Sequence, residues 1–296
     1  MITFVQLIFR SARIITIIFL LPILSIFAEA NGDLEVFFLD VGQGDATLVT
    51  TPGGKHILID GGVGEGYGTK DQGKKTVLPY LRKNGIRRLD TVVITHPDFD
   101  HIGGLISVVK SKPIQIGEVL DPGLAHPSEA YLELLKAIRE RPEIQYRQPR
   151  SGDILDCGEE VRAEVVSPPY LLEDNNECSI VIKMTYGNIS FLLTGDAAGT
   201  AEKLMIGKYG YRLRVTVLKA GHHGSKHSTG EEFLEYLLPR VVIVSAGKDN
   251  KYGHPNEEVI GRVKKRGAKI YRTDQQGTIT IITDGKDYRV EIEKES

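Results

Sequence analysis

Cysteine is scarce in this chain, and a large excess of charge of either sign is missing. Only Cys157 and Cys178 occur in 296 residues, and they form no Cys-x-x-Cys pair, so we do not count them as metal ligands. An oxidising compartment would permit a disulfide between them, contributing roughly 3 kcal/mol, and two buried free thiols are the alternative. The net charge of -2 gives no general basic field, so a nucleic-acid partner would have to be held by a local patch.

Long hydrophobic runs are missing outside the N-terminus, and no internal linker, low-complexity segment or sequence repeat interrupts the chain. The one long run, residues 14–27, follows Arg10 and precedes Ala28-Glu29-Ala30. This order is typical of a signal peptide, and the run is shorter than the roughly 20 residues of a comfortable membrane span. We therefore expect residues 1–30 to be a signal peptide, with an uncleaved N-terminal anchor as the alternative, and residues 31–296 to form the folded domain. The protein would then be secreted, or would reside in the periplasm or cell envelope.

Four side chains of metal-binding type lie within six positions: His96, Asp98, Asp100 and His101. They follow residues 89–94, an apolar and β-branched run that predicts a buried strand. Imidazole and carboxylate bind Zn²⁺, Mn²⁺ or Fe²⁺, and an i, i+2 pair leaving an extended segment points two donors the same way. Asp100 and His101 are expected on a tight loop closed by two glycines, where they face a second ion. The spacing therefore predicts two metal ions.

The remaining pattern is one of short strands and helices in two similar halves. Glycine turns separate the first strands, which indicates an antiparallel beginning, and glycine-rich residues 63–75 predict a mobile loop. Its Lys70, Lys74 and Lys75 are candidates for contact with a phosphate backbone, with a solvated loop as the alternative. Strands are expected at residues 34–40, 46–50, 56–62, 89–94, 116–121, 161–167, 179–186, 189–194, 215–220, 241–247, 269–272 and 278–282, and helices near residues 77–81, 105–109, 130–138 and 256–260.

Two later strands also end next to residues of metal-binding type. The strand at residues 189–194 ends before Asp196, which places one carboxylate at the edge of a sheet. His222 and His223 follow the strand at residues 215–220, and in an extended segment adjacent side chains point to opposite sides. We therefore expect one of them, His222, to bind metal, and the other to serve the substrate or to orient a ligand.

The motif His96-x-Asp98-x-Asp100-His101 resembles the His-x-His-x-Asp-His signature of the metallo-β-lactamase superfamily, with an aspartate where most members have the second histidine. This departure makes Mn²⁺ or Fe²⁺ more plausible beside Zn²⁺. Together with Asp40-Val41-Gly42-Gln43-Gly44-Asp45-Ala46 and His222-His223-Gly224-Ser225, the motif looks like the metallo-β-lactamase-like domain of the ComEC-type competence DNA-uptake proteins. The resemblance runs from about residue 34 to the C-terminus. The chain would correspond to their hydrolase domain alone, in an exported form.

The resemblance implies an α+β fold, a four-layer αββα sandwich with the site between the sheet edges. It also implies that Asp196 bridges two ions, and that His254, in a Tyr-Gly-His-Pro element, completes the second ion or donates a proton. Residues 174–177 lie where many members carry a third histidine ligand, and no histidine is found there, so the first ion would be weakly held or completed by water. The implied metal ligands are His96, Asp98, Asp100, His101, Asp196 and His222, and the implied catalytic residues are Asp100, His223 and His254.

The function expected from these residues is that of an exported metal-dependent hydrolase, a phosphodiesterase or nuclease acting on DNA. Two divalent ions, Zn²⁺ or Mn²⁺ with Fe²⁺ as a third option, would activate water and stabilise the attacking and leaving oxygens. Lysines near the later site elements would neutralise phosphates, and two serines would contact an anion; these are Lys219, Lys226, Lys248 and Lys251, and Ser225 and Ser228. One alternative is a hydrolase of a lactone, thioester or β-lactam, which needs less positive charge at the rim of its site. A non-catalytic DNA-binding module is the other alternative.

Overall fold

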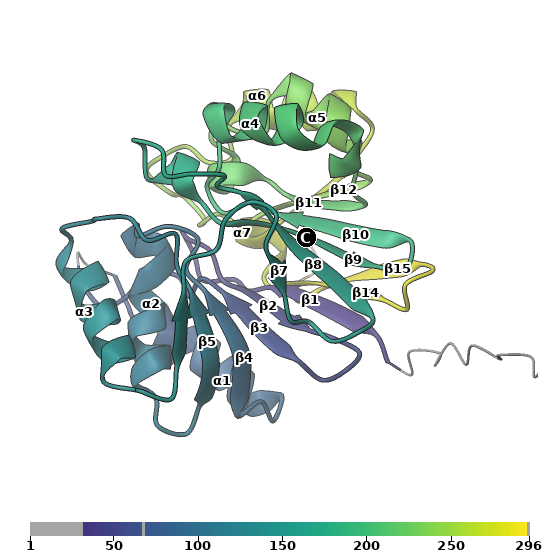
Figure 1. Ribbon diagram of the computed structural model, residues 1–296. Coiled ribbons are helices and arrows are strands. Elements are labelled where there is room, and N and C mark those ends of the chain that lie inside the picture. The colour runs from purple at the N-terminus through teal and green to yellow at the C-terminus, as the bar shows by residue number, and fades with distance from the viewer. Residues whose placement is uncertain (1–31, 67–68, 295–296) are drawn as a thin grey trace, which may run out of the picture.

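The computed structural model describes residues 32–66 and 69–294 and contains two β-sheets that pack face to face (Figure 1). Helices cover the outer face of each sheet, so the layers run helix, sheet, sheet, helix. The four-layer α+β sandwich expected from the sequence is confirmed. The predicted signal peptide or anchor, residues 1–30, lies outside the described residues. Among the described residues, no helix combines the length and apolar character needed to span a bilayer.

The first sheet comes from the N-terminal half and from the last two strands of the chain. Its strand order is β15-β14-β1-β2-β3-β4-β5-β6, in which β1 to β3 are antiparallel neighbours and β3 to β6 run parallel. The strands are β1 Leu34–Phe38, β2 Thr47–Thr50, β3 His56–Ile59, β4 Arg88–Val93, β5 Gln115–Leu120, β6 Gln145–Arg147, β14 Ile279–Thr283 and β15 Tyr288–Ile292. Because β3 and β4 are parallel, Asp60 and His96, which follow them, lie at the same edge of the sheet.

The second sheet comes from the middle of the chain. Its strand order is β13-β12-β11-β10-β9-β8-β7, in which β7 to β10 are antiparallel and β10 to β13 run parallel. The strands are β7 Ile154–Leu155, β8 Val161–Ser167, β9 Val181–Tyr186, β10 Ile189–Leu193, β11 Val217–Lys219, β12 Val241–Val244 and β13 Lys269–Arg272. The parallel strands β10, β11 and β12 end at one edge, which brings Asp196, His222 and Ser245 together.

Each sheet buries its outer face under amphipathic helices. Leu81, Leu105 and Leu134 of α1, α2 and α3 pack on the first sheet, and Met205 and Leu234 of α4 and α5 pack on the second. The helices are α1 Leu78–Lys83, α2 Phe99–Lys110, α3 Glu129–Arg139, α4 Gly199–Tyr209, α5 Glu231–Leu237, α6 Glu257–Lys265 and α7 Thr273–Gln276. Short helical turns are η1 Gly73–Val77, η2 Asn176–Cys178, η3 Gly210–Leu213 and η4 Gly221–Gly224.

Apolar side chains from both sheets fill the space between them. Alternate residues of β1 and β10, such as Val36, Phe38 and Phe191, point inward and are completely buried. Cys157 lies in this core and Cys178 ends η2, and both thiols are buried and free. The disulfide that the sequence left open does not form, and the alternative of two buried free thiols is confirmed. Burial raises the pKa of Cys157 to about 12, which keeps this thiol unreactive.

The glycine-rich segment after β3 is fixed against α2 in its later part. Asp71 accepts hydrogen bonds from Ser107 Oγ at 2.5 Å and from the Lys74 amide at 3.1 Å. Lys74 Nζ lies 3.4 Å from Asp71 and 3.7 Å from Glu65, so this lysine is already engaged with carboxylates. From Gly73 the chain continues through the π-helical turn η1 into α1. Residues 71–75 are therefore ordered structure, where the sequence predicted part of a mobile loop.

Candidate metal centre

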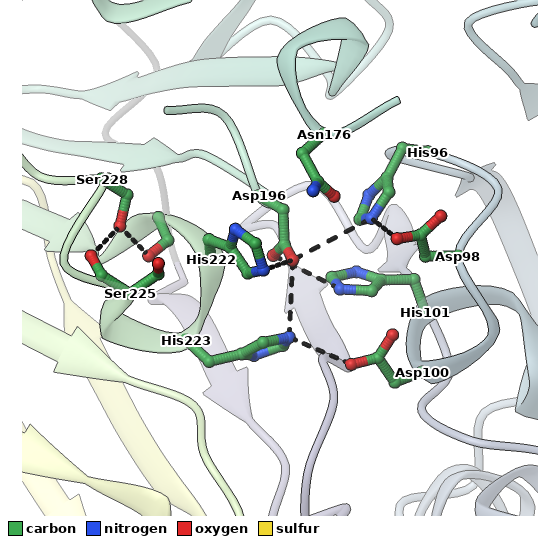
Figure 2. Close-up of polar contacts among 12 residues, drawn as sticks. His96, Asp98, Asp100, His101, Asn176, Asp196, His222, His223, Ser225 and Ser228 are labelled. Carbon is green, nitrogen blue, oxygen red and sulfur yellow. Dashed lines mark hydrogen bonds and ion pairs between the residues drawn. The ribbon is translucent and has the colours of Figure 1, made fainter. Parts of the chain in front are cut away.

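Side chains from both sheets meet where β4, β10 and β11 end, at one end of the sandwich (Figure 2). These side chains are His96 and Asp98 after β4, Asp100 and His101 in α2, Asp196 after β10, and His222 and His223 after β11. Neither sheet contains the cluster alone, because Asp196 of the second sheet lies among histidines of the first. The chain thus brings together residues that are far apart in the sequence.

Asp100 and His101 lie in a helix, and the tight loop expected for them is wrong. α2 begins at Phe99 and includes both residues in its first turn. The glycines that suggested a loop permit close backbone packing, since a Cβ atom on Gly103 would lie 2.0 Å from the amide nitrogen of Gly64. The helix can therefore press against the chain after β3, and this contact fixes the direction in which Asp100 and His101 point.

Three buried histidines are held through one ring nitrogen and leave the other nitrogen without a partner. Nδ1 of each ring contacts an oxygen: Thr95 Oγ1 at 3.0 Å for His96, Asp60 Oδ2 at 2.7 Å for His101 and the Ser245 carbonyl at 3.0 Å for His223. The three Nε2 atoms are buried, and no described residue forms a hydrogen bond with them. Metal-binding histidines are oriented through the second ring nitrogen in this way, so the three Nε2 atoms fit the role of metal ligands.

Asp196 faces all three of these free nitrogens. One of its oxygens lies 3.3 Å from His101 Nε2. The other oxygen lies 3.5 Å from His223 Nε2 and 3.9 Å from His96 Nε2. Ligand atoms that share one ion at about 2.1 Å are separated by about 3 to 3.5 Å, so these spacings are near those of a coordinated cation. Asp196 therefore occupies the centre of the cluster.

Two further carboxylates divide the cluster into two ligand groups. Asp98 Oδ2 lies 3.7 Å from His96 Nε2, and Asp100 Oδ2 lies 3.3 Å from His223 Nε2. We define the first ligand group as His96 and Asp98, and the second ligand group as Asp100, His101 and His223, with Asp196 between them. The donors are imidazole nitrogens and carboxylate oxygens, which suit Zn²⁺, Mn²⁺ or Fe²⁺.

The adjacent histidines after β11 do not adopt an extended conformation. Their φ angles are positive, 46° for His222 and 52° for His223, so the chain turns within η4. As a result, His222 Nε2 also faces Asp196, at 3.7 Å from Oδ2. The two rings differ in burial, since the side chain of His222 is 30% exposed and that of His223 is 2% exposed. His223 thus belongs to the buried second ligand group, and His222 lines its open side.

His254 lies beside the cluster. Its ring centroid is 5.6 Å from that of His222 and 6.3 Å from that of His223. Nδ1 of His254 is buried and has no hydrogen-bond partner among the described residues. The structure thus brings His254 next to the expected ligands, in an outer layer.

A buried ion pair lies beside the second ligand group, on the side of the histidine Nδ1 atoms. Lys219 Nζ lies 2.5 Å from Asp45 Oδ2 and also donates to two backbone carbonyls at 3.1 and 3.2 Å. Ligand-type atoms of Asp45, His101, Asp196 and His223 all lie within 4.8 Å of one another. However, Asp45 faces the Nδ1 atoms, at 3.5 Å from His223 and 3.9 Å from His101, whereas Asp196 faces the Nε2 atoms. Because both Nδ1 atoms already contact other oxygens, we assign Asp45 to holding the rings and Asp196 to the ligand side.

The sequence did not identify the two carboxylates that contact the Nδ1 atoms of the histidines, and it gave Lys219 the wrong role. Asp45 and Asp60 lie next to glycines at the edges of strands in the first sheet, and this neighbourhood was the signal that could have located them. Lys219 was expected to neutralise phosphates, but it is buried against Asp45, so that expectation is wrong.

The two serines expected to contact an anion instead hold the turn after the histidines. Ser228 Oγ donates to the Gly221 carbonyl at 2.5 Å and to the Ser225 carbonyl at 2.9 Å, and both serines are buried (Figure 2). The anion contact is therefore wrong for Ser225 and Ser228. Lys226, Lys248 and Lys251 are exposed, in positions open to solvent.

The charges of the cluster favour bound cations. Burial opposes charge on His101, yet Asp196 and Asp60 raise its pKa well above the ordinary value. Burial likewise opposes charge on His223, but Asp196 and Asp45 raise its pKa to about 10. Burial would raise the pKa of Asp196, but His223 and His101 hold it well below the usual range. The carboxylates therefore stay ionised and attract positive charge, either as protons on the imidazoles or as metal ions in their place.

Comparison with known sequences agrees with this geometry. The sequence pattern of the metallo-beta-lactamase superfamily matches residues 39–248. This chain belongs to the metallo-β-lactamase superfamily. The match includes both ligand groups and Asp196, and the candidate metal centre lies within it.

Curated relatives confirm the resemblance to the ComEC-type competence proteins. ComE operon protein 3 of Bacillus subtilis (strain 168) is 34% identical over 276 residues, which cover 89% of this chain and 34% of the relative. Competence protein ComA of Neisseria gonorrhoeae is 32% identical, with coverage of 85% and 33%. Recombination protein 2 of Haemophilus influenzae is 31% identical, with coverage of 83% and 28%. The chain thus spans about a third of the length of these relatives.

Solved structures share the fold at low sequence identity. CmlA, a diiron β-hydroxylase from Streptomyces venezuelae, superimposes with a TM-score of 0.55 and 16% identity over 84% of this chain and 54% of its own. Igni18, a metallo hydrolase from Ignicoccus hospitalis, gives a TM-score of 0.53 and 18% identity over 84% of this chain and 98% of its own. At such identities the likeness establishes the fold alone.

Proposed function

We propose that this member of the metallo-β-lactamase superfamily is a metal-dependent hydrolase that cleaves phosphodiester bonds, with DNA as its substrate. The observation that carries the proposal is the set of three buried Nε2 atoms that face carboxylates and lack hydrogen-bond partners among the described residues. DNA as the substrate is supported by relatives that are named for competence and recombination.

The residues present fit two divalent ions. The first ligand group would hold one ion and the second ligand group the other, and Asp196 would serve both because its carboxylate faces histidines of both groups. The first group has one imidazole and is otherwise rich in oxygen, which favours Mn²⁺ or Fe²⁺, whereas the second has two imidazoles and suits Zn²⁺ as well. When bound, such ions supply activation of water at neutral pH and stabilisation of charge on phosphate oxygens.

Metal uptake tests the first part of the proposal. Native mass spectrometry after loading with Mn²⁺ or Zn²⁺ should show two ions on the wild-type chain and fewer on Asp196→Asn, because the substitution removes the central anion. Asp249→Asn is the matched control, since Asp249 is exposed and its positive φ of 53° is tolerated by asparagine. If no loading condition gives bound metal on the wild-type chain, the proposal is wrong.

A substrate panel tests the second part. The metal-loaded protein is assayed on plasmid DNA, on bis-p-nitrophenyl phosphate and on a chromogenic β-lactam, with Mn²⁺ or Zn²⁺ added. We expect cleavage of both phosphodiesters. Hydrolysis of the β-lactam alone would instead favour the acyl-hydrolase alternative, and DNA binding without cleavage would favour the non-catalytic module.

We further propose that His254 donates a proton to the leaving oxygen. Asp100 and His223 would act beside it as members of the second ligand group. His254 lies beside His222, and its Nδ1 atom has no hydrogen-bond partner in the part of the chain that the structure describes. His254→Ala should lower DNA cleavage about 10²- to 10⁴-fold, because the alkoxide leaving group needs a proton. Hydrolysis of bis-p-nitrophenyl phosphate should fall much less, because its leaving group is stable as an anion. Equal losses on both substrates would exclude the proton-donor role.

We propose that the chain is exported and cleaved after Ala30. The support is the order of Arg10, the apolar run at residues 14–27 and the small residues that follow it. N-terminal sequencing of protein recovered from the envelope or the medium should begin at Asn31. An intact Met1 in a membrane fraction would favour the N-terminal anchor.

A further inference from the structure

We propose that the side-chain oxygen of Asn176 is a ligand of the ion held by the first ligand group. The inference rests on the proposed metal centre and adds one residue to it. Figure 2 shows the amide of Asn176 turned toward His96. Oδ1 of Asn176 is buried, and no described residue donates a hydrogen bond to it.

Asn176 Oδ1 is one of several buried polar atoms around the cluster that have no hydrogen-bond partner among the described residues. Buried polar atoms in folded proteins nearly always have a partner, so each exception calls for an explanation. In this cluster the exceptions include Nε2 of His96, His101 and His223 and Oδ1 of Asp196, and each of these atoms faces the space between the ligand groups. Asn176 Oδ1 shares their burial and their lack of a partner among the described residues, and the two proposed cations would together satisfy all five atoms.

The segment that carries Asn176 is fixed against the first ligand group. Ser179 Oγ accepts a hydrogen bond from the Asp196 amide at 3.1 Å and lies 3.5 Å from His96 Nδ1. Glu177 accepts hydrogen bonds from two backbone amides at the start of α4, at 2.7 and 3.0 Å. Ser179 thus ties the end of η2 to the cluster and Glu177 ties it to α4, so both neighbours of the turn are fixed by protein contacts.

The number of donors leaves room for Asn176 in the first ligand group. His96, Asp98 and Asp196 provide three ligand atoms, whereas the second ligand group with Asp196 provides four. Divalent transition ions in proteins take four or more ligands, and amide oxygens are donors for hard cations. Asn176 raises the first group to four protein ligands. His222 also faces Asp196 from the open side, and a six-coordinate ion has room for both.

The test counts bound ions without measuring activity. Mn²⁺ is titrated into metal-free protein, and free Mn²⁺ is followed by its electron paramagnetic resonance signal. The wild-type chain should bind two ions, and Asn176→Ala should keep one affinity while weakening the other about 10- to 100-fold. Asn175→Ala, the same change at the preceding residue of the same segment, should match the wild type. Asn176→Asp, which keeps an oxygen at this position, should still bind two ions.

The outcomes separate this inference from the proposed function. Two ions on the wild type and unchanged affinities in Asn176→Ala would overturn the role of Asn176 and leave the metal centre standing. Absence of any Mn²⁺ binding by the wild type would overturn both.

A second measurement needs no folded alanine variant. In protein labelled with ¹⁵N-asparagine, the side-chain amide signal of Asn176 is assigned by its loss in Asn176→Asp. That signal should shift when diamagnetic Zn²⁺ or Cd²⁺ is added, because coordination of Oδ1 withdraws electrons from the amide, and the signal of Asn175 should stay in place. An Asn176 signal that does not move under saturating metal would overturn the proposal.

Discussion

The two segments that carry most of the ligands, residues 95–104 and 221–230, are held in place by different means. The first is fixed by backbone packing, since a Cβ atom on Gly104 would lie 2.0 Å from the carbonyl oxygen of Gly61. The second is fixed by polar contacts, because the amides of Thr229 and Gly230 donate to Glu202 at 2.5 and 3.0 Å. The glycine packing of the first segment therefore does not depend on pH, whereas the support that Glu202 gives the second segment includes an ionisable group.

The Asp45–Lys219 ion pair joins these two halves, and breaking it should have the largest effect on stability. Lys219→Met leaves the Asp45 carboxylate buried without its cation, which should lower the free energy of unfolding by about 3–5 kcal/mol. Adding Asp45→Asn should restore part of the loss, because the buried charge is then removed. Urea denaturation of the wild type and the two variants measures these differences. A double variant no more stable than Lys219→Met would show that the lysine acts through other contacts.

The packing of the first segment can be broken at one glycine. Gly103→Ala should destabilise the protein by about 3 kcal/mol, at the upper end of overpacking effects, because the new methyl group meets backbone atoms that cannot rotate away. Gly207→Ala in α4 is the control: nothing lies within 4 Å of its added Cβ atom, and it should stabilise the helix by about 0.5–1 kcal/mol. Thermal denaturation of both variants measures these changes, and equal melting temperatures for the two would contradict the packing argument.

The polar support of the second segment should respond to pH. Burial raises the pKa of Glu202 to about 7, although two backbone amides favour its charged form. Glu202 therefore binds its proton more tightly in the folded state than in the unfolded state. The stability gained from this proton is complete below the ordinary pKa of 4.5 and is lost as pH rises through about 7. Relative to Glu202→Gln, the wild type should lose about 2–3 kcal/mol between pH 4.5 and pH 8. Unfolding curves with a constant difference across this range would contradict the assignment.

The smallest effect on the structure is expected from a change at Lys226, an exposed residue of the second segment. Lys226→Glu should leave folding and metal uptake unchanged but weaken DNA binding, and the dependence of binding on salt should become shallower. Lys83→Glu, the same change in charge on exposed α1, should leave DNA binding as in the wild type. Added salt should depress cleavage of DNA far more than that of bis-p-nitrophenyl phosphate. If DNA cleavage responds neither to salt nor to Lys226→Glu, we would abandon the nuclease proposal.

The strands and most of the cluster could be predicted from the sequence because apolar strands of ordinary length lead directly into its residues, whereas the four layers were implied by the resemblance to a family. His96 follows β4 and Asp196 follows β10, and each strand was recognisable from its own residues. Asp45 was not predicted as a site residue, because its role depends on contacts such as that with Lys219, which form only after the two sheets pack. A pattern in one stretch of chain carries no information about such contacts.

The two conformational errors have a similar cause. Glycines usually disfavour a helix, but in α2 the space that Gly103 leaves is filled by the chain after β3. The left-handed turn at His222 and His223 follows Gly221, where a Cβ atom would lie 2.4 Å from the Ala197 carbonyl oxygen. In both places a neighbour distant in sequence determines the local conformation, which is why propensity alone gave the wrong result.

Because Asp196 comes from the second sheet while His96 and His101 come from the first, an ion bound by Asp196 and either histidine would act as a cross-link. Its binding free energy would add to that of the apolar core in holding the sheets together. Without the ion, several carboxylates of like charge would face one another across the same space. The melting temperature would therefore rise with the concentration of free metal, and this rise would measure how fully the cross-link is formed.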